Sequence, residues 1–222
     1  MCGRFALVAT GEEVAAHYQL PETPFIAPRY NIAPTQPVAA VRLSSAGARQ
    51  LTHFQWGLIP SWSKDPSLGS KMINARAETA ADKPAFRAAF KRRRCLIPAT
   101  GCYEWQAVAG RKQPMHIHAA DGGLLSLAGL WEVWHAPDGG ELETCTILTT
   151  TPNALMASIH NRMPVIVEPL DYGAWLAADT PADELHHLLR PYAAEQLAAY
   201  PVSTAVHRPQ NDTADCIAPL AE

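Results

Sequence analysis

Nineteen prolines are spread along the 222 residues, and they limit the folds that this chain can form. Each proline lacks a backbone donor and ends or kinks a helix, so the scattered prolines break the chain into many short elements. Apolar residues make up 48% of the sequence, enough to bury a substantial core. No apolar run approaches the roughly 20 residues that cross a membrane, so we expect no membrane association.

Between the prolines, the residue pattern predicts short strands and a few helices. Strands are expected within 30–43, 51–62, 94–98, 101–108, 114–120, 125–134, 144–152 and 199–207. The segments 94–98 and 101–108 are expected to pair with each other through the turn "PATG". Helices are expected at 12–20, 82–93, 153–160 and 181–190, the second capped by Asp82 with Pro84 in its first turn.

Successive strands with few helices between them favour an α+β fold. We expect a mixed, mostly antiparallel sheet or open barrel with flanking helices. The sequence has no repeat, low-complexity tract or long linker, so residues 1–222 are expected to form one domain. A monomer is the expected oligomeric state.

The charge and the cysteines narrow the possible environments and ligands. The net charge of −3 gives no overall attraction to a polyanion, so a nucleic-acid site would need a local patch of Arg and Lys. Five cysteines, an odd number, with no export signal at the N-terminus favour reduced thiols in the cytoplasm. There is no C-x-x-C motif, and the "HIH" at 116–118 lacks an evident third ligand, so we expect no metal and no cofactor.

The N-terminal stretch "MCGRFA" places a cysteine directly after the initiator methionine. Removal of Met1 before this small residue would leave Cys2 with an amine and a thiol on neighbouring carbons. An α-amine titrates near ~7.7–8.0 and a thiol near ~8.5, so both nucleophiles are partly available at neutral pH. The alternative is that Cys2 is a small buried residue or part of a frayed end.

Three other stretches carry polar groups that folding alone does not require: "MINARAET", "GCYEWQ" and "SIHNRMPVI". Structural explanations exist for each. Asn74 could be a turn residue, and Glu104 could face water between Tyr103 and Trp105. His160 could interact with the end of a helix, where a cation is favourable.

Eight motifs occur in one order along the chain: "CGRFA", "YNIAP", "WGLIPSW", "NARAET", "RRCLIPATGCYEW", "AGLWE", "TILTTTPN" and "HNRMPVI". With them the chain resembles the SRAP family (SOS response-associated peptidases) over roughly residues 2–209. Members of this family include abasic-site processing proteins, which crosslink themselves to abasic sites in single-stranded DNA through an N-terminal cysteine. The resemblance therefore implies a DNA-damage and DNA-repair function.

The resemblance also implies roles for individual residues. The catalytic positions would be Cys2, Asn74, Glu104 and His160. Cys2 would form a Schiff base and then a thiazolidine with the abasic aldehyde, Asn74 would hold the sugar, and Glu104 and His160 would move protons.

The resemblance further places a DNA-binding surface beside these positions. Arg4, Arg76 and Arg162 would contact flanking phosphates, and Pro34 and Trp62 would stack on or wedge against neighbouring bases. The expected partners are single-stranded DNA with abasic sites and proteins of the replication machinery.

Two other functions use the same residues. In a cysteine peptidase or amidohydrolase with an N-terminal nucleophile, the Cys2 thiol would attack a carbonyl, and removal of Met1 could be self-processing. In a non-covalent single-strand binding module, Cys2 would be dispensable. A covalent protein–DNA product would distinguish abasic-site crosslinking from both of these alternatives.

Overall fold

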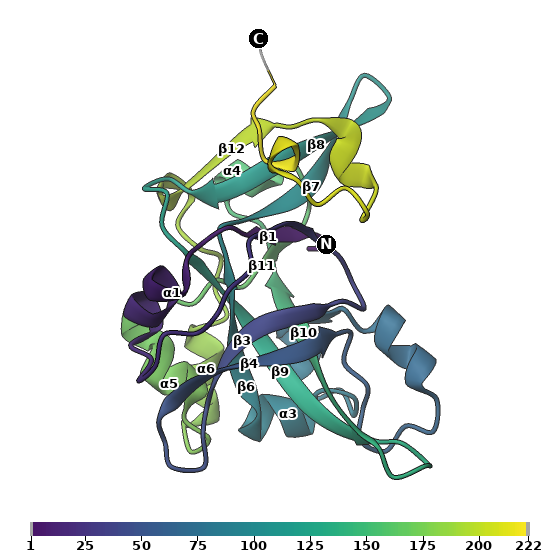
Figure 1. Cartoon of the computed structure of the whole chain (residues 1–222), viewed down its shortest axis with the longest axis vertical. Coiled ribbons are helices and arrows are strands. Elements are labelled where there is room, and N and C mark those ends of the chain that lie inside the picture. The colour runs from purple at the N-terminus through teal and green to yellow at the C-terminus, as the bar shows by residue number, and fades with distance from the viewer. Residues whose placement is uncertain (1, 221–222) are drawn as a thin grey trace.

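A computed structural model of the chain describes residues 2–220, and two β-sheets make up most of it (Figure 1). The smaller sheet has the order β12-β8-β7-β1-β2, with every pairing antiparallel. Its strands are β1 (Phe5–Leu7), β2 (Arg29–Ile32), β7 (Gly101–Val108), β8 (Arg111–Ala119) and β12 (Leu197–Pro201).

The larger sheet closes on itself. Its path is β11-β10-β4-β3-β6-β9, and a further pairing of β9 with β10 joins β10, β4, β3, β6 and β9 into a barrel. The strands are β3 (Pro37–Leu43), β4 (Arg49–Trp56), β5 (Asn74–Arg76), β6 (Arg94–Ala99), β9 (Leu125–His135), β10 (Glu141–Thr150) and β11 (Met163–Pro164). Only β4 and β5 run parallel to their neighbour β10 among the described strands.

The described helices are short, as the scattered prolines predict. They are α1 (Gly11–Tyr18), α2 (Ala77–Ala80), α3 (Arg87–Arg92), α4 (Ala154–Ala157), α5 (Tyr172–Leu176) and α6 (Ala182–His187). One-turn or two-turn 3₁₀ segments are η1 (Pro66–Lys71), η2 (Pro169–Asp171), η3 (Ala194–Gln196), η4 (Thr204–His207) and η5 (Ala214–Cys216). No helix within residues 2–220 is long and apolar enough to span a membrane.

The prediction of an α+β fold with mostly antiparallel strands is confirmed, but the pairing of 94–98 with 101–108 is wrong. Strand β6 belongs to the barrel, between β3 and β9, whereas β7 pairs with β1 and β8 in the smaller sheet. Thr100 lies between the two strands, so "PATG" carries the chain from one sheet to the other. A short turn that joins two paired strands and a short connection between two sheets have the same local sequence signals, so the sequence did not distinguish them.

Three helix and strand boundaries also differ from prediction. Asp82 and Pro84 lie in turns before α3, which begins only at Arg87. Helix α4 ends at Ala157, well before His160, and the expected strand at 199–207 gives way to η4. Each difference falls near the end of an element, where backbone groups gain partners from outside it.

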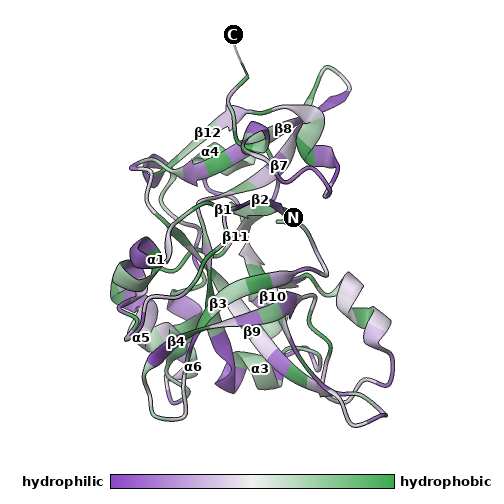
Figure 2. Cartoon of the chain, in the orientation of Figure 1, coloured by the Kyte–Doolittle hydropathy of each residue, from purple (hydrophilic) through white to green (hydrophobic). Residues whose placement is uncertain are grey.

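Apolar side chains fill the barrel and the space between the two sheets, and the apolar residues in Figure 2 concentrate on the strands. Phe5 of β1 packs edge-on against Trp56 of β4, with ring centroids 5.2 Å apart. The Trp56 indole N–H also donates to the carbonyl oxygen of Ile73, at 2.8 Å. Through these two contacts, Trp56 joins the N-terminal strand β1 to the barrel next to Asn74.

Candidate active site

Cys2 is fully buried and is held by Asn74. The Asn74 side-chain amide donates to the carbonyl oxygen of Cys2 at 2.8 Å. Asn74 begins β5, which lies parallel to β10 with Asn74 opposite Ile147. A barrel strand therefore fixes the residue that orients the N-terminal segment.

The smaller sheet contributes Cys102 and Glu104 to the same place. Cys102 lies opposite Phe5 in the β1–β7 pair, and Glu104 follows two positions later on the same face of β7. Both side chains are buried, Glu104 with only 3% exposure. The pKa of the Cys102 thiol is raised well above its usual range by its hydrogen bond with the Cys2 side chain, by burial, and by the nearby charges of Cys2 and Glu104.

His160 lies in the loop between α4 and β11, with its ring held by the next backbone segment. The Arg162 N–H donates to His160 Nδ1 at 3.0 Å. In the neutral ring this acceptor role leaves the proton on Nε2. The Gln106 side-chain amide donates to the Ser158 carbonyl oxygen at 2.9 Å, which joins this loop to the strand that carries Glu104.

Arg162 is tied to the barrel and to α2 by its side chain. Its two terminal nitrogens reach the two carboxylate oxygens of Glu78 at 2.6 and 2.9 Å, and Nη2 also donates to the Thr149 carbonyl oxygen at 2.5 Å. The hydrogen bond from Arg162 is the main cause that lowers the pKa of Glu78. Paired forks of this kind fix a guanidinium in one orientation.

The other two arginines differ in their surroundings. Arg76 is exposed at the end of β5, opposite Thr149 on β10, so Arg76 and Arg162 share one edge of the barrel. Arg4 is only 9% exposed, and its Nη1 donates to Asn31 Oδ1 and to the Val206 carbonyl oxygen, both at 2.7 Å. These bonds tie the N-terminal segment to the C-terminal one, and a phosphate contact for Arg4 stays a prediction.

Pro34 and Trp62 lie in loops at the ends of barrel strands. Pro34 is half-buried in the turn before β3, where the Thr35 N–H donates to the Trp56 carbonyl oxygen at 2.7 Å. Thr35 has a φ of 70°, a left-handed conformation that a β-branched residue rarely adopts. Trp62 is 62% exposed in the loop after β4, so its ring is accessible for stacking.

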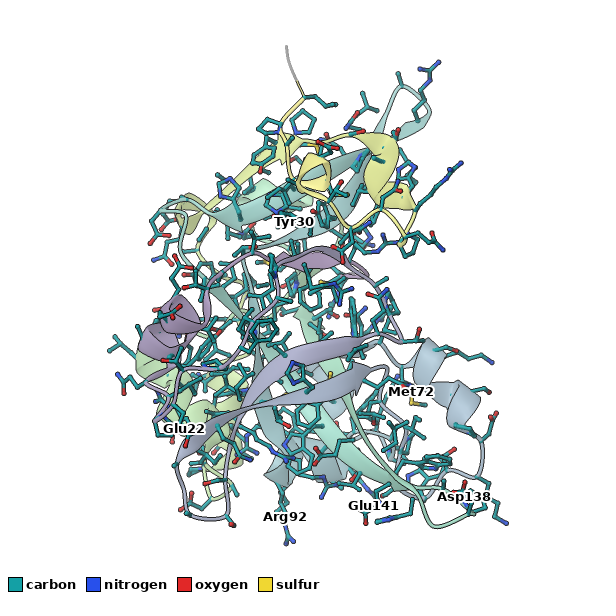
Figure 3. All side chains as sticks on the ribbon, in the orientation of Figure 1. Glu22, Tyr30, Met72, Arg92, Asp138 and Glu141 are labelled. Atoms are coloured by element: carbon teal, nitrogen blue, oxygen red, sulfur yellow. The ribbon has the colours of Figure 1, made fainter. Side chains whose placement is uncertain are left out.

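A basic segment at 91–94 spans the end of α3 and the start of β6. Arg92 points outward at the lower end of the molecule in Figure 3, whereas β1, which follows Cys2 in the chain, lies near the middle of the molecule in Figure 1. Arg93 pairs with Glu132 at 2.5 Å, and the buried Arg94 donates to three backbone carbonyl groups. Two of these cations thus stabilise the fold.

Two supporting residues escaped the sequence analysis. Trp56 links Phe5, Ile73 and the Pro34 turn, and Cys102 contacts the Cys2 side chain. The alternation in "GCYEWQ" could have identified Cys102, because it places residues 102 and 104 on one face of a strand. The predicted removal of Met1 concerns a residue outside the described range.

His116 and His118 were the remaining candidates for metal ligands. Their rings stack, with centroids 5.7 Å apart, and burial, with a smaller effect of His118, lowers the pKa of His116 to about 4. Within residues 2–220, no group of three or more His, Cys, Asp or Glu side chains is placed to hold a metal ion.

The chain is similar to a family of known proteins. Residues 1–209 match the family model described as SOS response associated peptidase (SRAP). The chain is 42% identical over 223 aligned positions to the abasic site processing protein YoqW of Bacillus subtilis, covering 98% of this chain and 99% of that one.

Two further matches extend the comparison to vertebrates and to crystal structures. The chain is 37% identical to the abasic site processing protein HMCES of Gallus gallus, with 80% of this chain aligned to 60% of that longer protein. A crystal structure of a Bacteroides thetaiotaomicron protein superposes with a TM-score of 0.89 at 28% identity, over 99% of this chain and 100% of that one.

Proposed function

The chain belongs to the SOS response associated peptidase (SRAP) family, and on this basis we propose that it processes abasic sites in single-stranded DNA by bonding to them covalently through Cys2. The observation that carries the proposal is the position of Cys2. It is buried between two sheets and held by Asn74, beside a face of β7 that carries a buried carboxylate. A frayed or purely structural N-terminus would not need that carboxylate.

The proposed chemistry uses both nucleophiles of a terminal cysteine. With Met1 removed, the Cys2 nitrogen is an amine, which condenses with the ring-opened abasic aldehyde to give an imine and release one water. The Cys2 thiol then adds to the imine carbon, its proton passes to the nitrogen, and a five-membered thiazolidine forms. The second step is intramolecular, so its effective concentration is high.

Asn74 and Glu104 have distinct roles in this scheme. Asn74 fixes the Cys2 carbonyl group, and so limits where the neighbouring amine and thiol can point. Glu104, almost fully buried two residues from Cys102, moves protons as the sugar opens and the imine forms.

His160 is the second proton-transfer group. Because its Nδ1 accepts from the Arg162 N–H, the neutral ring presents an Nε2–H that can donate a hydrogen bond to a sugar oxygen. Its pairing with Arg162 also places it at the barrel edge where Arg76 is exposed, so the same edge serves proton transfer and phosphate binding.

Access to the lesion favours a single strand. Arg76 provides an exposed positive charge near the site, and Trp62 provides an exposed aromatic ring. A base beside the lesion can stack on such a ring only when it is free of its duplex partner. We propose that Arg162 contributes to phosphate binding while Glu78 keeps its guanidinium in place.

The family description favours one alternative, because it names a peptidase. In that reaction the Cys2 thiol attacks a peptide carbonyl and the α-amine acts as the base. Both reactions need the same terminal residue, and they differ in their product. The peptidase alternative predicts turnover of peptides and no covalent DNA species.

The test is incubation of the trimmed protein with a single-stranded oligonucleotide that carries one abasic site, followed by a denaturing gel. We expect a heat-stable protein–DNA band without a reducing agent. Cys2→Ala keeps the amine but loses the thiol, so its adduct should survive only after borohydride reduction. A Cys2→Ala adduct that is as heat-stable as the native one would place the bond elsewhere.

A further inference from the structure

Cys102 is a second thiol at the site, and the proposed DNA chemistry gives it no role. Cys2 and Cys102 belong to one buried cluster, with exposures of 0% and 1%, and their side chains are hydrogen-bonded to each other. Packing alone would accept any small apolar residue at position 102. A thiol in contact with the nucleophilic thiol is a chemical feature that packing does not require.

The strand register explains why the two side chains meet. Cys102 lies opposite Phe5 on the adjacent antiparallel strand, and the Tyr103 N–H donates to the Arg4 carbonyl oxygen at 2.9 Å. This pairing fixes β7 against the segment that begins at Cys2. Asn74 holds the same segment from the barrel side, so Cys2 is restrained from both sheets.

We propose that Cys102 is a resolving cysteine, which forms a reversible disulfide with Cys2 when a hydroperoxide oxidises the site. The disulfide removes the thiol that the proposed function requires, so the effect on DNA crosslinking rests on that function. Formation of the disulfide itself does not.

The reaction balances with one molecule of hydrogen peroxide. The Cys2 thiolate attacks one peroxide oxygen, the O–O bond breaks, and Cys2 becomes a sulfenic acid as one water leaves. The Cys102 sulfur then attacks the Cys2 sulfur, the S–O bond breaks, and the second water leaves with the Cys102 proton. Two thiols are oxidised and the peroxide is reduced to two waters. A thiol reductant reverses the disulfide by exchange.

The surroundings suit this order of events. The raised pKa of Cys102 keeps its proton in place, so this thiol is a poor nucleophile toward the peroxide itself. Cys95 and Cys145 serve as a comparison for the pair of Cys2 and Cys102 within the same protein. Both are fully buried in the barrel, and burial raises the pKa of each thiol.

The experiment treats the trimmed protein with hydrogen peroxide, blocks remaining thiols by alkylation, and maps disulfides by mass spectrometry after non-reducing digestion. We expect loss of two hydrogens from the intact mass and a Cys2–Cys102 linked peptide pair. A link between Cys95 and Cys145, or a native Cys2 that proceeds to sulfinic acid without any link, would overturn the proposal.

Two variants separate the resolving thiol from general oxidation. Cys102→Ala should form no such link, and its Cys2 should gain oxygen and lose DNA crosslinking beyond rescue by a thiol reductant. Cys216→Ala removes a buried thiol that contacts the Asn211 carbonyl oxygen. This variant should behave as the native chain, losing DNA crosslinking after peroxide treatment and regaining it after a thiol reductant is added. Equal rescue of native protein and Cys102→Ala would contradict the proposal.

The readouts also keep the two proposals apart. If the reduced protein never crosslinks abasic DNA but the Cys2–Cys102 link forms, the disulfide stands and the proposed function fails. Cys102→Ser, which keeps the side-chain size, repeats the comparison if Cys102→Ala lowers the melting temperature.

Discussion

Asn74 donates a hydrogen bond of 2.8 Å to the backbone carbonyl oxygen of Cys2, and this bond joins the first described residue to the edge of the barrel. It acts on the backbone, so it positions the Cys2 amine and thiol together. Displacement of a reacting group by about 1 Å can cost roughly 10²-fold in rate, which sets the scale for its loss.

Asn74→Ala should therefore slow adduct formation by roughly 10²-fold while the protein stays folded. The measurement is the initial rate of the heat-stable band on a denaturing gel. Asn161→Ala, an exposed asparagine beside His160, is the matched control and should keep the native rate. Native rates in both variants would show that the bond to Cys2 has no part in the reaction.

Glu104→Gln should slow adduct formation by ~10²–10⁴, because a neutral amide cannot exchange protons with the sugar hydroxyl or the imine. The variant keeps the size of a side chain that is almost fully buried, so the fold should be retained. Glu184→Gln, in the first turn of α6, controls for loss of one negative charge. An unchanged rate in Glu104→Gln would assign Glu104 a structural role.

The exposed arginine and the paired arginine should behave differently. Arg76→Ala should weaken single-strand binding and reduce the slope of log affinity against log salt by about 1. Arg162→Ala should weaken binding as well. It should also lower the melting temperature, because the Thr149 carbonyl group and the Glu78 carboxylate lose their hydrogen bonds from the Arg162 guanidinium. Arg87→Ala on α3 should change neither slope nor melting. A salt slope unchanged in Arg76→Ala would exclude a phosphate contact there.

The sequence predicted the fold class and the strand that carries Glu104, but not the contacts between distant segments. The alternation in "GCYEWQ" correctly placed Glu104 on a strand, although water exposure, the structural explanation for Glu104, is wrong, since Glu104 is buried. The bidentate pair of Arg162 with Glu78 joins residues 84 positions apart and has no local signal. The order of the strands in each sheet also has no local sequence signal. It depends on pairings such as that of Phe5 with Cys102, which form only in the folded chain.

Acid should destabilise the fold through His116. Burial holds the pKa of this ring at about 4, below the ordinary value of about 6.5 that it regains on unfolding. Between these values the unfolded chain binds one more proton, so stability is full above about pH 6.5 and falls as pH drops toward 4.

The measurement is urea unfolding at pH 7 and near pH 4.5 for native protein and His116→Phe. The variant carries no titrating ring, so it should lose less stability on acidification than the native chain, by up to roughly 3 kcal/mol across the full window. His187→Phe is the control, since His187 is exposed in the last turn of α6. Equal acid sensitivity in native protein and His116→Phe would contradict this prediction.

The central claim is that the bond to DNA is made by the terminal residue. The most direct measurement is mass spectrometry of the heat-stable adduct after digestion of both DNA and protein. We predict a peptide that begins at Cys2, lacks Met1, and carries the sugar remnant on Cys2 with loss of one water. A remnant mapped to a lysine or any other residue, or to a peptide that retains Met1, would contradict the account.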